Sequence, residues 1–195
     1  SSIWLLVSEQ PQRLPQTIRS RCQRLDLAPP PESEALPWLR SRLGEQAPQC
    51  IDAAALCLRL AHGAPLQALQ WALNDQLRVR QNAVDGLVAI AEGRRDPLAI
   101  AAEWQPLEVR DLVALLSDWV SDLLRLVADR QGARLINLDA RVMLETLAAR
   151  LDPREGHDFL RHLLQINTLL DAPINKPLLL ESLLVRWALL LQPRE

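Results

Sequence analysis

The sequence contains few of the residues that β-sheets and phosphate-binding loops require. Among 195 residues there are no tyrosines, one phenylalanine, six glycines, three threonines, eight isoleucines and ten valines. Strands are enriched in β-branched and aromatic residues, so this composition disfavours an all-β domain and a doubly wound α/β sheet. The six glycines are too widely spaced to build a glycine-rich phosphate loop. We therefore expect no nucleotide site of the P-loop type within this stretch of chain.

Cysteine and histidine are equally scarce. The three cysteines are odd in number and form no C-x-x-C pair: Cys22, Cys50 and Cys57. This pattern fits neither a disulfide framework nor a zinc site, and it is typical of a reducing cytoplasm. The three histidines, His62, His157 and His162, lack metal-ligand spacing, so packed or solvated imidazoles are favoured over a metal site. For Cys22, which lies among arginines, a packed thiol is favoured over a reactive thiolate.

Long apolar runs and a strong overall charge are also missing. The net charge is −2, which gives no global field to attract nucleic acid or an anionic membrane. Charged residues interrupt the leucine runs, so no membrane span is expected, and the first residues do not resemble a signal peptide. We therefore expect a cytoplasmic protein. The chain lacks an initiator methionine, and we expect it to begin part-way through a longer protein.

Leucine and alanine are abundant, with 42 and 24 copies respectively, and both are strong helix formers. Apolar residues recur at helical spacing through most of the chain after Pro29-Pro30-Pro31, a stiff boundary that neither a helix nor a strand continues. We expect a small bundle of three helices up to about residue 75. A larger helical bundle follows, with a strong helix start at Asp152-Pro153 and a last helix that stops before Pro193. The predicted fold class is all-α.

The first segment differs from this helical pattern. Ile3 to Val7 is a short continuous apolar run, which favours a buried strand. A lone strand has no neighbour for its backbone groups. We therefore expect its sheet to lie in a part of the protein that precedes Ser1, and the segment to be disordered or paired with another copy here. A basic stretch from Pro11 to Arg24 follows, and residues 1–31 carry a net charge of +2.

One motif is specific enough to indicate a family. Residues 14–22 read Leu-Pro-Gln-Thr-Ile-Arg-Ser-Arg-Cys. Together with the preceding apolar segment and the later helices, this run resembles the sensor-1 strand and Ser-Arg-Cys motif of bacterial AAA+ clamp-loader subunits, which serve DNA polymerase III. The motif His62-Gly63-Ala64-Pro65-Leu66 lies where that family begins its sensor-2 helix. Residues 175–187 are similar to the final helix of its collar domain, so the resemblance covers essentially the whole chain.

The resemblance implies a domain organisation and a role for Arg21. Residues 1–28 would be the remnant of an AAA+ domain, 29–75 a three-helix lid and 76–195 a helical collar that joins similar subunits. In the family, the arginine of Ser-Arg-Cys reaches into the ATP site of the neighbouring subunit, and Arg21 matches it. Ser20 and Cys22 would hold the loop that aims it. The alternative is that Arg21 is one of several solvated loop arginines.

The sensor-2 motif departs from the pattern of the ATP-hydrolysing subunits. Those relatives carry an arginine at its fourth position, where this chain has Leu66 three residues after Gly63. Ser8 occupies the sensor-1 place but has no P-loop beside it. The resemblance therefore implies a non-hydrolysing subunit without a cofactor in this chain. ATP would be bound by neighbouring subunits, and zinc could belong only to the preceding region. The partners through the collar would be gamma/tau and delta subunits.

Two further readings stay open. The chain could be a fragment of an ATP-hydrolysing gamma/tau-type subunit, which Leu66 disfavours. It could also be a helical DNA-binding adaptor using the basic stretch, for which a local charge of +2 is weak. In the favoured reading no intrinsic catalysis is expected, although the complex is an enzyme. Contact with the sliding clamp and primer–template DNA would be indirect, and no membrane would be involved.

Overall fold

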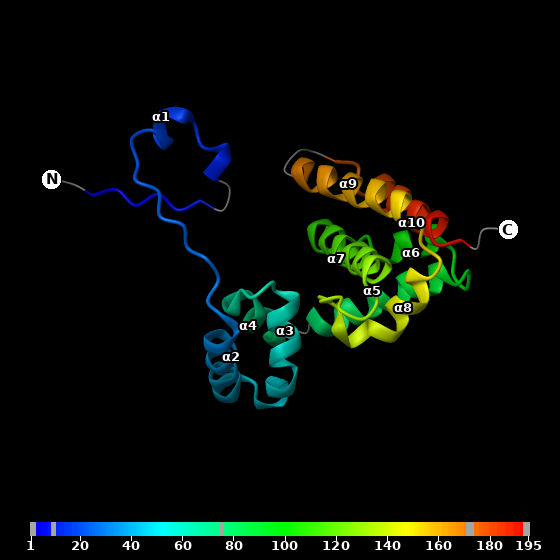
Figure 1. The fold of residues 1–195 in the computed structure, drawn as a ribbon, viewed down its shortest axis with the longest axis horizontal. Helices are drawn as coiled ribbons and strands as arrows, with labels where there is room; N and C mark the ends of the chain where they lie inside the picture. Colours follow the sequence, from blue (N-terminus) through cyan, green and yellow to red (C-terminus); the bar gives the residue numbers. More distant parts are fainter. Residues whose placement is uncertain (1–2, 9–10, 75, 171–173, 193–195) are drawn as a thin grey trace. The chain divides into compact units, whose positions relative to one another are not determined.

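The computed structural model describes residues 3–8, 11–74, 76–170 and 174–192. By internal contacts the chain divides into two units, Ser1–Pro30 and Pro31–Glu195. The described residues form helices and connecting segments, and no strand occurs among them, which confirms the predicted all-α class. Figure 1 shows the helices in chain order. None of the helices in these ranges is long and apolar enough to cross a membrane.

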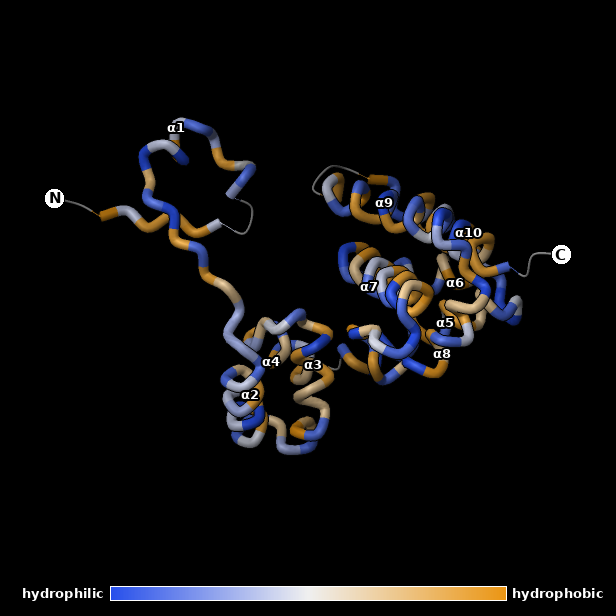
Figure 2. The backbone as a smooth tube through the Cα atoms, in the orientation of Figure 1, coloured by the Kyte–Doolittle hydropathy of each residue, from blue (hydrophilic) through white to orange (hydrophobic). Residues whose placement is uncertain are grey.

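The first unit contains little regular structure. Its elements are the short 3-10 helix η1 (Pro11–Arg13) and the single-turn helix α1 (Gln16–Arg19). Residues 3–8 are irregular, and the apolar side chains of Ile3 to Val7 are between 57% and 96% exposed. Figure 2 shows this segment as largely hydrophobic. The segment forms no strand here, because the described part of the chain supplies no second strand to accept its backbone hydrogen bonds.

The second unit begins with a small bundle of three α-helices. They are α2 (Glu32–Gln46), α3 (Ala54–Leu60) and α4 (Pro65–Leu73), with the 3-10 helix η2 (Pro48–Ala53) between the first two. Leu39, Leu43 and Cys57 are completely buried at its centre. The periodicity predicted these helices, and α4 begins at Pro65 as expected for a first-turn proline. We call α2–α4 the N-terminal bundle.

The remaining helices form a second hydrophobic core, which we call the C-terminal bundle. Its helices are α5 (Gln76–Ala91), α6 (Pro97–Glu103), α7 (Val109–Ala128), α8 (Arg141–Ala148), α9 (Pro153–Leu169) and α10 (Lys176–Leu190), with the 3-10 helix η3 (Leu138–Ala140) before α8. Helix α7 packs against α8 and α9, and α10 packs against α5, α6 and α9. Pro193, expected to follow the last helix, lies outside the described residues.

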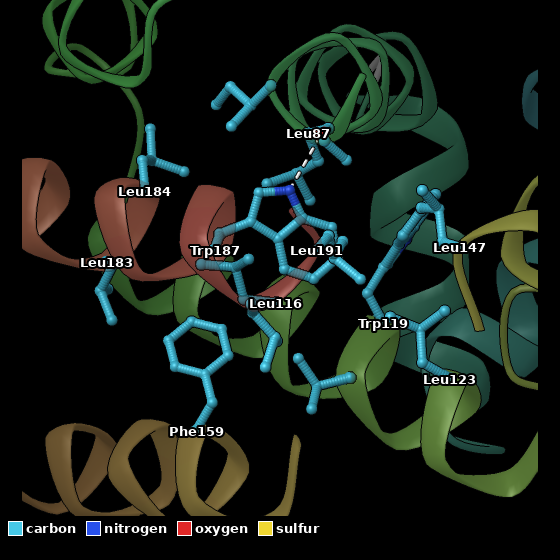
Figure 3. Packing of buried hydrophobic residues seen from close by; sticks show 14 of the residues in the cluster. Leu87, Leu116, Trp119, Leu123, Leu147, Phe159, Leu183, Leu184, Trp187 and Leu191 are labelled. Carbon is cyan, nitrogen blue, oxygen red and sulfur yellow. Dashed lines mark hydrogen bonds between the residues drawn. The ribbon is translucent and has the colours of Figure 1, made fainter. Parts of the chain in front are cut away.

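Two tryptophans stand at the centre of the C-terminal bundle. Trp119 of α7 and Trp187 of α10 are fully buried, and their rings meet edge to face with centroids 6.5 Å apart. Aromatic pairs favour this geometry because the positive ring edge faces the negative ring face. Figure 3 shows leucines and Phe159 around the pair. Helix α7, with nine buried residues, therefore forms the interior of the bundle.

Buried polar groups fix the long connection between α7 and α8. The carboxylate of Asp122, fully buried on α7, accepts hydrogen bonds from the backbone amides of Ile136 and Asn137 at 3.0 and 2.8 Å. Arg80 of α5 donates to Asn137 at 2.7 Å and to Asp139 at 2.8 Å. Buried charges need such partners, because leaving one unpaired is costly. The connection is therefore anchored to α5 and α7.

Candidate functional site

The Ser-Arg-Cys motif lies on a tight turn that follows α1. Pro15 precedes the helix, and the amide of Ser20 donates to the carbonyl of Gln16 at 2.9 Å. The amides of Arg21 and Cys22 both donate to the carbonyl of Ile18, at 3.1 and 3.2 Å. The backbone of the motif is thus held by local hydrogen bonds that α1 supplies. These bonds need no sheet, so the turn forms without one.

The side chains of the motif differ in what they contact. The hydroxyl of Ser20 donates to the carbonyl of Thr17 at 3.4 Å, which ties the turn back to α1. Arg21 and Cys22 are exposed. Arg24, in contrast, pairs with Asp26 at 2.6 Å. Within the described ranges no ion pair engages Arg21, so its planar donor fork is available to an anion supplied by another molecule.

The sensor-2 residues belong to the second unit, at the turn between α3 and α4. Gly63 has a φ of +84° and its amide donates to the carbonyl of Leu58 at 2.9 Å, which ends α3. Leu66 lies in the first turn of α4 and is 67% exposed. An exposed leucine side chain offers neither a charge nor a hydrogen-bond donor to a phosphate. Within the first unit, the structure brings Ser20, Arg21 and Cys22 together on one turn.

The remaining candidate residues form no further site. Ser8 lies exposed in the irregular segment 3–8. Burial raises the pKa of the Cys57 thiol to about 11, with nearby Cys50 acting in the same direction. On α9, burial lowers the pKa of His162, and Arg186 of α10 adds to this effect. The described residues contain no group of three or more His, Cys, Asp or Glu side chains that could hold a metal ion.

One pair was not predicted from the sequence. The imidazole Nε2 of His62 lies 3.2 Å from a carboxylate oxygen of Asp118 in the middle of α7. The hydrogen bond to Asp118 raises the pKa of His62 above its ordinary value of 6.5, while burial acts in the opposite direction. The sequence indicates only that His62 lies at a helix end, next to Gly63. Its pairing with Asp118 follows from the packing of α7.

Comparison with known proteins places the chain in a family. The family described as "DNA polymerase III, delta subunit, C terminal" matches residues 74–188, which is more than half of the chain and includes nearly all of the C-terminal bundle. The chain belongs to this family. The matched range begins just before α5 and ends within α10. The polymerase III delta-type C-terminal domain therefore corresponds to the larger of the two hydrophobic cores.

Curated relatives extend the likeness to the rest of the chain. Over 98% of its own length, the chain is 29% identical to DNA polymerase III subunit delta' of Pseudomonas aeruginosa. Over 97% of its own length, the chain is 31% identical to the subunit of the same name from Escherichia coli. The match covers 58% and 55% of these two relatives. The chain thus corresponds to the C-terminal portion of delta'-type subunits and spans just over half of their length.

Proposed function

We propose that this chain is part of a non-hydrolysing subunit of the bacterial replicative clamp loader. It assembles in the cytoplasm with gamma/tau- and delta-type subunits through its C-terminal bundle. Its Arg21 completes the ATP site of a neighbouring subunit, which links the chain indirectly to the sliding clamp and to primer–template DNA. The two relatives named delta' support this subunit type, since they match nearly the whole chain.

The proposal rests on Arg21, whose backbone is fixed and whose side chain is exposed. Its backbone is held by the turn after α1, while its side chain is exposed and has no ion-pair partner among the described residues. A guanidinium is permanently charged and presents a planar fork of donors. Placed at the γ-phosphate of a neighbouring site, it stabilises the negative charge of the transition state. Arg21 would then be an arginine finger that acts in trans.

One feature favours a subunit that does not hydrolyse ATP itself. Leu66 replaces the arginine that the sensor-2 motif carries in hydrolysing subunits. It is 67% exposed at the start of α4, and its side chain offers neither a charge nor a hydrogen-bond donor to a phosphate. ATP hydrolysis by the purified protein alone would contradict this part of the proposal.

The surface of α10 supports assembly through the C-terminal bundle. This helix is apolar on more than one side: Leu183 and Trp187 are fully buried, while Leu178 and Leu189 are 61% and 59% exposed. A groove of about 580 Å³ lies between α10 and the segment from α5 to α6, and Leu189 is among the residues that line it. Exposed apolar groups gathered on one helix favour contact with another protein surface.

A pair of matched variants tests the assembly surface. Leu189→Asp places a charge on the α10 groove, whereas Leu164→Asp alters a similarly exposed leucine, 55% accessible, on α9. We expect the α10 variant to lower co-purification of the chain with gamma/tau- and delta-type subunits, and the α9 variant to leave it unchanged. Circular dichroism establishes that both variants stay folded. Equal co-purification of the two variants would exclude the α10 groove as the assembly surface.

The role of Arg21 is tested in a clamp loader reconstituted with this protein. Arg21→Ala should lower DNA-stimulated ATP hydrolysis while the complex still assembles. Arg24→Ala is the matched control, since it removes a charge from the same unit but from a side chain already paired with Asp26. Arginine fingers contribute about 10³- to 10⁵-fold to the rate at their own site. Hydrolysis at the wild-type rate in the Arg21→Ala complex would refute the proposed role.

A further inference from the structure

The turn between α3 and α4 holds His62 in an unusual backbone conformation. The amide of His62 donates a hydrogen bond to the carbonyl of Arg59, and the amide of Gly63 donates one to the carbonyl of Leu58. This is the bond pattern of a Schellman helix end. In this motif the residue at the position of His62 is usually glycine because it adopts a left-handed conformation. His62 adopts it with a φ of +50°. Residues other than glycine are uncommon in this conformation, and histidine is among those that adopt it most readily.

The side chain of His62 reaches the C-terminal bundle. Its Nε2 lies 3.2 Å from the carboxylate of Asp118, whose side chain is only 21% exposed, while that of His62 is 60% exposed. Asp118 belongs to α7, the helix at the interior of the C-terminal bundle. His62 follows the C-terminal end of α3, which belongs to the N-terminal bundle. The pair therefore connects the two hydrophobic cores of the second unit directly.

An apolar contact also connects the two cores. Leu77, in the first turn of α5, packs against the core of the N-terminal bundle. It provides an apolar contact next to the chain connection between α4 and α5. The His62–Asp118 pair adds a second, polar contact away from that connection. Two contacts at separate places resist rotation of one bundle against the other, whereas a single contact at the connection acts as a pivot.

We propose that His62 and Asp118 form a pH-dependent latch that fixes the N-terminal bundle against the C-terminal bundle. The inference rests on this contact alone and does not depend on the proposed function. The latch lies at the turn between α3 and α4, next to Gly63.

The charged groups that face His62 determine how the latch responds to pH. They are Asp118, Asp122 and Arg125, all on α7. Asp122 is fully buried and pairs with Arg125 at 2.8 Å, which leaves Asp118 as the carboxylate next to the imidazole. The folded-state pKa of His62 is raised, chiefly by the hydrogen bond to Asp118. The latch is therefore complete below the ordinary value of 6.5 and is lost as the pH rises through the raised pKa.

The orientation of the two bundles is the quantity that tests the latch. Spin labels are attached to unnatural amino acids introduced at Arg40 of α2 and Arg154 of α9, both exposed, so the native cysteines stay in place. Distances between the labels are measured in the whole chain at about pH 6 and about pH 8.5, on either side of histidine titration. We expect one narrow distribution at the lower pH and at least a twofold broader one at the higher pH.

Three variants separate a latch from an ordinary surface pair. His62→Gly fits the left-handed backbone, and Asp118→Asn keeps the size of the side chain without its charge. Both should give broad distributions at either pH, while the control His162→Gln should match the wild-type chain. NMR titration of the imidazoles should show the pKa of His62 fall in Asp118→Asn. A narrow distribution in His62→Gly at about pH 6, or a wild-type distribution independent of pH, would overturn the proposal.

Discussion

The indole N–H of Trp187 donates a hydrogen bond to the backbone carbonyl of Leu87 over a distance of 2.8 Å. The bond joins α10 to α5 inside the C-terminal bundle, and Figure 3 shows it as a dashed line among buried leucines. Buried indoles usually find such a partner, because an unpaired N–H in an apolar interior is costly. The last helix is therefore fixed to the first helix of the same core by both packing and a polar contact.

Replacing Trp187 by phenylalanine should destabilise the chain. The variant loses the hydrogen bond to Leu87 and leaves a cavity beside Trp119, and together these should cost about 1–3 kcal/mol of unfolding free energy. Trp4→Phe is the matched control, since Trp4 is 84% exposed in the irregular segment. Urea unfolding measures both variants. Equal stability of the two would show that the Trp187 bond contributes nothing.

Arg150, between α8 and α9, should stabilise two helix ends. Its guanidinium donates to the carbonyl of Ala91 at 2.8 Å and also to the carbonyl of Leu191, next to the ends of α5 and α10. The carbonyls at a helix end lack partners within the helix and favour a positive charge. We expect Arg150→Met to lower stability by about 1–3 kcal/mol. The control Arg154→Met, at an exposed position, should change it by less than about 0.5 kcal/mol.

Two glycine-to-alanine substitutions should act in opposite directions. A Cβ at Gly156 of α9 would lie 2.9 Å from a methyl group of Leu124 and 3.2 Å from Leu151, inside the core. At Gly44 of α2 the nearest atom would be 3.8 Å away. Alanine is favoured over glycine in helices by about 1 kcal/mol. Thermal unfolding should therefore show stabilisation by Gly44→Ala and destabilisation by Gly156→Ala; the same sign for both would contradict the close packing of α9 on α7.

The three thiols should react with a disulfide reagent in a fixed order. Cys22 is exposed, Cys50 is half-buried and Cys57 is buried. Burial raises the pKa of Cys57 to about 11, so almost none of its thiolate exists at neutral pH. We expect Cys22 to react first and Cys57 only after denaturation. Mass spectrometry of the labelled peptides checks the order, and early labelling of Cys57 would show that the N-terminal bundle opens readily.

Local signals in the sequence predicted the helix starts well. Asp152 accepts hydrogen bonds from the amides of Arg154 and Glu155, which is the cap that its position before Pro153 indicated. The same signature at Asp96-Pro97 starts α6, where the Asp96 carboxylate accepts from the amide of Leu98. Helix α6 was not predicted, because only seven residues follow this cap and they are too few for an apolar period to be evident.

Contacts between residues far apart in the chain could not be predicted from the sequence. His62 was read as a packed or solvated histidine, and its pairing with Asp118 depends on how α7 packs. The run from Ile3 to Val7 depends on distant residues in the same way: an apolar run becomes a strand only where another strand adjoins it, and the described residues supply none. For Arg21, the sequence indicated the motif and the structure adds that its side chain is exposed on a turn fixed by α1. Its action on ATP stays a prediction.

The role of Arg21 is tested most directly by single-turnover hydrolysis of ATP already bound to the reconstituted loader. This measurement separates binding from the chemical step, so it reports on transition-state charge. For Arg21→Ala we predict normal ATP binding and loss of the fast phase from the neighbouring site, by about 10³-fold or more. Arg21→Lys, which keeps the charge but not the planar fork, should restore little of it. An unchanged fast phase in Arg21→Ala would contradict the account.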